Sequence, residues 1–199
     1  MFARLGLAVS NPRAALALAG DRETAGRSGS DLLAAIVILL LATQLRWLVQ
    51  AGWLGFSVNG TLGMHALVHV LTRTLTVELG TLVVAAAIIF VASGAKRELG
   101  RSFDFACVTV LPLVFVYLLA QTIIGIGDLP MPPRLSRTVL IISSLWTLAL
   151  VILAVIDVRR PVLVVSIDRN ARRAGWAIAT VAFAGIAVQG LWVAQHPEL

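Results

Sequence analysis

Two charged residues, Arg46 and Glu78, lie inside long apolar segments of the sequence. A charge within a membrane span is costly, and it usually pairs with another group or lines a functional cavity. Counted from Leu32 and Ser93, the inner ends of their segments, the two residues reach depths of about 21 and 22 Å at 1.5 Å per residue. We therefore predict a structural contact between Arg46 and Glu78. The alternative is that each side chain extends to water by itself.

His65, His69 and Arg73 recur every four residues, so they share one face of any helix that contains them. The two histidines have a spacing found in metal sites, but zinc or iron needs three or four ligands. The remaining histidine, His196, stands near the end of the sequence, and no acidic residue lies between His65 and Arg73. We favour a polar face at the membrane interface. A contact with a partner and ligation of a metal or cofactor are the alternatives.

The sequence lacks the residue patterns of the common catalytic sites. It has no serine elbow, no zinc-protease helix motif, no glycine loop of the kind that binds phosphate and no acid pair. We therefore predict a protein that is not an enzyme and that has no catalytic, cofactor-binding or metal site.

Small and uncharged polar residues inside the apolar segments indicate helix packing. Gly175, Ala179 and Ala182 form a small-residue face, which allows close approach of another helix. Hydroxyl and amide side chains elsewhere suit hydrogen bonds between helices. These are Gln121, Thr122, Ser143, Ser144, Thr147, Thr180 and Gln189.

The elements that carry these residues are membrane helices. Of the 199 residues 59% are hydrophobic and only 13% are charged, which is unlike a soluble globular protein. The predicted fold is an all-α integral membrane protein, a bundle of five transmembrane helices with a short N-terminal amphipathic helix. Each span is long enough to cross about 30 Å of hydrocarbon. The predicted spans are residues 32–54, 74–93, 103–126, 136–156 and 175–194.

The first 30 residues are predicted to form a cytoplasmic segment, followed by the transmembrane domain over residues 31–199. Asn11 can cap, and Pro12 can begin, a helix through about Ala19 that lies along the membrane surface. A disordered tail is the alternative, and Gly20 to Ser30 is typical of a flexible linker. Within the third span, Pro112 predicts a kink at a packed position.

The basic residues predict the orientation of the spans. Twelve of the sixteen fall on one side of the predicted spans and four on the other, so the N-terminus is expected in the cytoplasm and the C-terminus in the periplasm. The abundance of Arg and Ala suggests a GC-rich bacterium and therefore its inner membrane. Because the basic residues stand in short stretches beside apolar segments, they suit lipid headgroups rather than nucleic acid.

Short stretches of the chain resemble the Yip1 family of five-span membrane proteins, in particular its prokaryotic branch. Asn11-Pro12-Arg13-Ala14-Ala15-Leu16 is similar to the amphipathic entry of that family. Gly100-Arg101-Ser102-Phe103 followed by Leu111-Pro112-Leu113 is similar to its loop and third span. The acidic-aromatic motif of the eukaryotic members is absent. The resemblance implies an embedded scaffold or organiser that is not an enzyme.

Three functions are compatible with this pattern. We favour a scaffold that binds other membrane proteins within the lipid bilayer, because the spans offer packing surfaces without catalytic groups. The first alternative is an accessory subunit of a larger energy-converting or light-harvesting membrane complex. The second is a small transporter that uses Arg46, Glu78 and Gln121.

Overall fold

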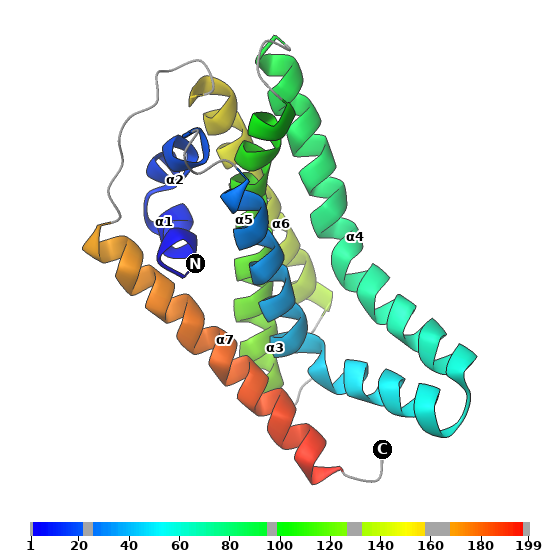
Figure 1. The fold of residues 1–199 in the computed structure, drawn as a ribbon. Helices are drawn as coiled ribbons and strands as arrows, with labels where there is room; N and C mark the ends of the chain where they lie inside the picture. The colour runs from blue at the N-terminus through cyan, green and yellow to red at the C-terminus, as the bar shows by residue number, and fades with distance from the viewer. Residues whose placement is uncertain (1, 22–25, 95–98, 127–132, 158–167, 197–199) are drawn as a thin grey trace.

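The computed structural model describes residues 2–21, 26–94, 99–126, 133–157 and 168–196, and it is helical in these ranges apart from short turns (Figure 1). Five of its helices are long and apolar enough to cross a membrane. They are α3 (Arg27–Ser57), α4 (Gly60–Ala92), α5 (Leu99–Ile126), α6 (Pro133–Asp157) and α7 (Arg169–Gln195). The predicted all-α membrane bundle is therefore confirmed.

Helix α5 forms the centre of the bundle. It packs against α3, α4, α6 and α7, and it is the most deeply buried of the five long helices. Pro112 lies inside α5 without ending it, and its side chain is fully buried, as expected for a packed position. An uninterrupted run of buried residues surrounds it, from Asp104 to Phe115.

The N-terminal segment consists of two short helices, α1 (Phe2–Ser10) and α2 (Pro12–Ala19). The expected helix start is confirmed, since the Asn11 side chain accepts a hydrogen bond from the backbone N–H of Ala14 at 3.1 Å. A disordered tail is excluded for residues 2–21. The pair does not simply rest on a lipid surface, because Leu5, Leu7 and Leu16 are at most 1% exposed within the bundle.

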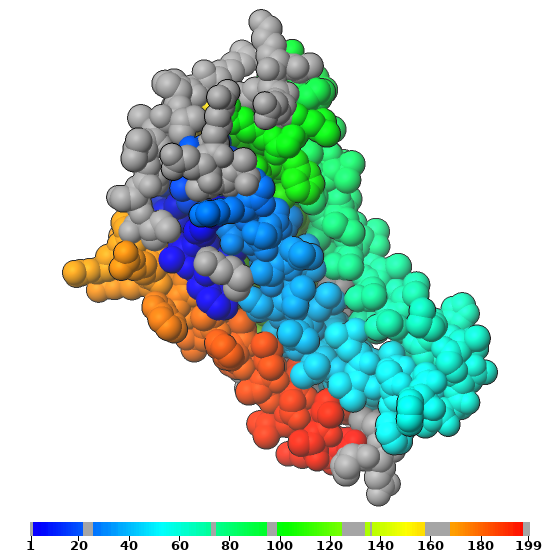
Figure 2. Space-filling view, in the orientation of Figure 1, coloured from blue at the N-terminus to red at the C-terminus, as the bar shows by residue number. Residues whose placement is uncertain are grey.

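Figure 2 shows where the N-terminal helices lie. Their dark blue surface fills the space between the orange beginning of α7 and the lighter blue α3. Helix α1 packs most extensively on α7, and α2 packs on α1, α5 and α6. Within the predicted linker, residues 22–25 lie outside the described part of the structure, and α3 begins at Arg27 instead of after Ser30.

The first two long helices extend past their predicted spans. Residues 55–73 were expected to connect spans, but α3 continues to Ser57 and α4 begins at Gly60. Asn59 caps α4 by accepting a hydrogen bond from the backbone N–H of Thr61 at 2.9 Å. The connection is therefore a tight helical hairpin, and in Figure 1 its cyan tip stands to one side of the other helices.

Candidate functional site

Arg46 lies on the side of α3 that faces α7. Its guanidinium carbon is 5.1 Å from the ring centre of Trp47 and 5.5 Å from that of Trp192, within the range of cation–π attraction. Gln189 of α7 approaches the Arg46 backbone N–H at 3.4 Å. The Trp192 ring also stacks on His196, with ring centres 4.3 Å apart. Arg46 therefore belongs to an aromatic cluster at one end of the bundle.

The structure does not bring Arg46 and Glu78 together. In the part of the chain that it describes, no ion pair joins them. Gly55 and Gly63 lie against each other across the α3–α4 hairpin, so a residue near position 72, rather than Glu78, is level with Arg46. A shift of six residues corresponds to about 9 Å along a helix. The predicted depths were equal because they were counted from Leu32 and Ser93, whereas α3 begins five residues before Leu32, at Arg27, and α4 ends at Ala92.

Glu78 is nevertheless buried, with 5% of its surface exposed. It shares the buried face of α4 with Leu82, Ala85 and Ile89, which follow at helical spacing. Its Oε2 has no hydrogen-bond partner among the described residues. Since Glu78 is the only acidic residue in α4, this helix offers no chain of carboxyl groups for an ion.

His65 and His69 are both exposed on α4, one turn apart. Within the described ranges, no group of three or more histidine, cysteine or acidic side chains is arranged to hold a metal ion. The side chain of Arg73 lies outside the described part of the structure. The geometry therefore leaves the two histidines as an exposed polar strip on the first half of α4.

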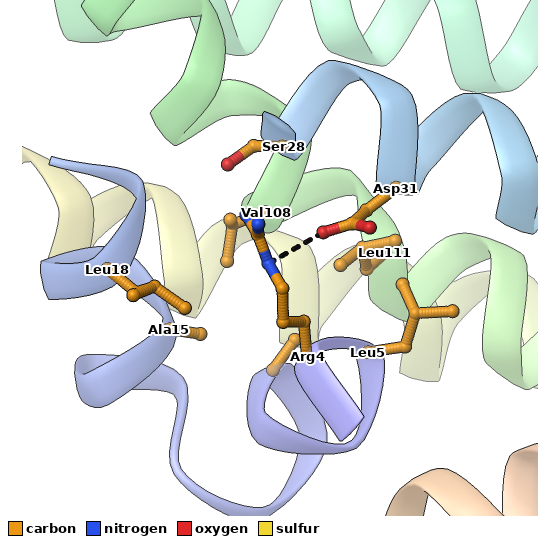
Figure 3. A pocket seen from close by; sticks show the side chains of 9 residues that line it. Arg4, Leu5, Ala15, Leu18, Ser28, Asp31, Val108 and Leu111 are labelled. Atoms are coloured by element: carbon orange, nitrogen blue, oxygen red, sulfur yellow. Dashed lines mark ion pairs between the residues drawn. The ribbon is translucent and has the colours of Figure 1, made fainter. Parts of the chain in front are cut away.

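An ion pair that was not predicted joins α1 to α3. Arg4 Nε lies 2.9 Å from Asp31 Oδ2, and both side chains are largely buried (Figure 3). Beside the pair is a cavity of about 20 Å³ that Ser28 and Val108 also line, large enough for one water molecule. Arg4 and Asp31 stand 27 positions apart in the sequence, so their pairing depends on the docking of α1 and has no signal in their spacing.

Two further hydrogen-bonded contacts join Gly20, after α2, and Gly26, before α3, to α5. The Arg101 guanidinium donates to the carbonyl of Gly20, with Nε at 2.9 Å. The backbone N–H of Gly26 donates to Asp104 Oδ2 at 2.8 Å. Gly26 has a φ of +78°, which favours glycine, and it stands directly before α3. The contact was not predicted, although an acidic residue at the start of a predicted span, Asp104, is the feature of the sequence that could have indicated it.

The small-residue face predicted on the last span is confirmed. Ala171, Gly175, Ala179, Ala182 and Gly185 are buried on α7. Gly175 crosses Gly6 of α1 so closely that a Cβ on Gly6 would overlap the backbone of α7 at Ala171 and Gly175.

Further along α7, Gly185 meets two other helices. A Cβ there would lie 2.9 Å from both Ala42 Cβ of α3 and Thr122 Oγ1 of α5. The stripe on α7 is therefore used entirely inside the molecule, and it offers no open surface to a partner.

A lateral groove of about 470 Å³ lies between α4 and α6, with α5 as its floor. Its walls combine small or hydroxyl-bearing residues with branched apolar ones. From α4 come Thr76, Val77, Gly80, Thr81, Val84, Ala85 and Ile88, from α5 Leu113, and from α6 Ser144, Thr147, Leu148 and Val151. We call this the α4–α6 groove.

The α4–α6 groove contains one polar group that the fold leaves unsatisfied. Thr147 is 4% exposed, and its hydroxyl has no hydrogen-bond partner among the described residues. On the opposite wall Gly80 faces open space, since an added Cβ would meet no atom within 4 Å. The sequence indicated Thr147 and Ser144 as packing residues but did not show that both line a groove.

Comparison of the chain with protein-family models, with curated proteins and with solved structures finds no match. The geometry of its own residues is therefore the basis for a functional proposal.

Proposed function

We propose that this protein is a membrane scaffold that binds a transmembrane helix of another membrane protein in the α4–α6 groove. The observation that carries the proposal is the buried Thr147 hydroxyl, which lines the groove and lacks a partner within the described chain. In hydrocarbon an unsatisfied hydroxyl is unfavourable, and a neighbouring helix can supply its hydrogen bond.

The shape of the α4–α6 groove supports a helix as its occupant. Helix–helix interfaces in membranes are rich in glycine, serine and threonine, because small side chains let two backbones approach closely. Gly80, Thr81 and Ser144 provide such positions on both walls. Val84 and Ile88 follow one and two turns after Gly80, so the apolar contacts continue along a helix-sized path.

The location that we propose is a bacterial inner membrane, with the N-terminus in the cytoplasm and the C-terminus in the periplasm. The twelve basic residues on one side of the spans support this orientation. The likeness to the prokaryotic branch of the Yip1 family stays a hypothesis that rests on the short stretches around Asn11 and Pro112. It agrees with a scaffold that has no chemistry of its own.

The test is photo-crosslinking in intact membranes from single positions on α4. Val84 lines the groove and is 58% exposed, whereas its neighbour Val83 is 68% exposed but does not line it. With a photoreactive amino acid in place of Val84, we expect a discrete product with another membrane protein that mass spectrometry identifies. The same replacement of Val83 is the matched control, because residue type and exposure are similar.

Variants of the α4–α6 groove complete the test. An added Cβ at Gly80 meets no atom within 4 Å, so Gly80→Leu should extend into the groove and abolish the Val84 product while the purified protein keeps its fold. Crosslinking of Val84 to lipid alone, or an unchanged product in Gly80→Leu, would refute the proposal. A lone monodisperse protein after gentle solubilisation, with no product at either position, would also argue against it.

A further inference from the structure

The tip of the α3–α4 hairpin is an apolar surface that the bundle does not cover. Between residues 50 and 70, Ala51 and Gly63 are the buried positions, and both lie where the two helices cross. A Cβ on Gly63 would lie 2.7 Å from the Ala51 carbonyl oxygen. The large apolar side chains point away from this crossing. They are Trp53, Leu54, Phe56, Val58, Leu62, Met64 and Val68, all between 40% and 90% exposed.

The same part of the chain contains no charged residue. From Trp47 to Thr72 the sequence has 26 residues without a single Asp, Glu, Lys or Arg. A protein surface in water, or the rim of a protein–protein interface, normally carries charges around its apolar centre. An apolar face without such a rim fits a lipid environment, and it continues the lipid-facing surfaces of α3 and α4.

The lengths of α3 and α4 do not allow them to cross the membrane as straight helices. Their 31 and 33 residues correspond to about 46 and 50 Å, against about 30 Å of hydrocarbon. Tilting alone would require an angle of about 50°, beyond the usual range of 0–40°. The end of the hairpin must therefore leave the membrane or turn along it.

Figure 1 shows that the hairpin turns sideways. The cyan end of α3 bends away from the bundle, and the hairpin tip does not extend past the red end of α7 in this view. Figure 2 shows the same cyan surface as a projection at the side of the molecule, with no other described helix over it. In this view the tip therefore stays within the length of α7.

We infer that the tip of the α3–α4 hairpin, residues 50–70, is a membrane anchor that lies in the outer interfacial layer of the bilayer. Phe56 and Leu62 enter the acyl-chain boundary, and Trp53 lies at headgroup level, where indole rings are favoured. This inference is independent of the α4–α6 groove, which lies further along α4.

The test is a depth measurement on the full chain in phosphatidylcholine vesicles. Phe56 is 90% exposed, and the native Cys107 is 1% exposed, so a nitroxide spin label attaches selectively to a Phe56→Cys variant. Leu62→Cys is a second position on the other helix of the hairpin. Ser10→Cys, at the exposed end of α1, is the control.

We expect labels at positions 56 and 62 to collide frequently with oxygen, which concentrates in lipid. Their collision rate with a water-soluble nickel complex should be lower than that of a label at position 10. Nickel collisions equal to those at Ser10 would place the hairpin in water and overturn the inference. Loss of collisions with both reagents would show that protein, such as a second copy of this chain, covers the hairpin. That result would overturn it as well.

Discussion

At the crossing of α1 and α7, replacing glycine by alanine is predicted to destabilise the protein, the reverse of its usual effect in a helix. Within a helix, glycine is about 1 kcal/mol less favourable than alanine, so Gly→Ala normally stabilises. At Gly6 the added Cβ would overlap the α7 backbone at Ala171 and Gly175. Backbone atoms cannot rotate away as a flexible side chain does. The Gly6→Ala variant should therefore weaken the docking of α1.

The expected magnitude follows from the cost of overpacking. Extra methyl groups in a packed interior cost about 1–3 kcal/mol, which lowers the ratio of docked to undocked α1 by about 5-fold to 150-fold. Undocking would uncover Leu5 and Leu7, which are 1% exposed in the bundle. It would also separate Arg4 from Asp31. The five long helices should stay packed, because Gly6 does not contribute to contacts among them.

Amide hydrogen exchange read by mass spectrometry, on protein in lipid nanodiscs, measures this effect directly. Faster exchange is expected in residues 2–10 of Gly6→Ala, with unchanged exchange in α5. Gly190→Ala is the matched control, because Gly190 lies on α7 but an added Cβ there meets no atom within 4 Å. Exchange in residues 2–10 that stays at the wild-type rate in Gly6→Ala would refute the close α1–α7 crossing.

Three other predictions concern Asp31, Asp104 and Gly26, at the contacts of α1 and the start of α3 with the bundle. Asp31→Asn leaves the largely buried Arg4 without its counter-ion, so the docking of α1 should lose about 1.5–3 kcal/mol. Amide hydrogen exchange should then be faster in α1 but not in α7. Equal exchange in wild type and variant would contradict this prediction. Asp104→Ala removes the acceptor of the Gly26 N–H, so amide hydrogen exchange at the start of α3 should rise while α1 stays protected. Protection that persists at Gly26 would count against this role of Asp104. The added Cβ of Gly26→Ala meets no atom within 4 Å, but the alanine must adopt a φ of +78°, which is strained. The thermal unfolding midpoint in detergent should therefore fall by an amount that corresponds to about 1–2 kcal/mol. An unchanged midpoint would disprove this backbone strain.

Helix packing by small residues was the part of the tertiary structure that the sequence predicted best. Gly175, Ala179 and Ala182 recur on one face of an apolar helix, and this spacing has the same meaning whichever helix is the neighbour. The neighbour itself was not predictable. Gly6 stands in a segment too short to be recognised as a packing helix, although it forms the closest contact with Gly175.

The pairing of Arg46 with Glu78 shows why side-chain contacts were harder to predict. Depth along a helix can be counted from sequence only if the helix ends are known, and the inner end of α3 is at Arg27 instead of Leu32. Direction around the helix axis is a second unknown. Arg46 follows Ala42 by one turn, and the contact of Ala42 with Gly185 of α7 places that face away from α4.

The sequence by itself determined that this protein is a membrane bundle of five spans, because about 20 consecutive apolar residues can satisfy their backbone hydrogen bonds in lipid as a helix. It also determined the start of α2, through the local contacts of Asn11 and Pro12. Only the tertiary structure decided which polar groups meet and which remain open. Arg4 pairs with Asp31, whereas Thr147 lines the α4–α6 groove and its buried hydroxyl has no partner among the described residues. Which side chains meet depends on how each helix is rotated about its axis and where it crosses its neighbours. Both are set by contacts between residues that are distant in the sequence.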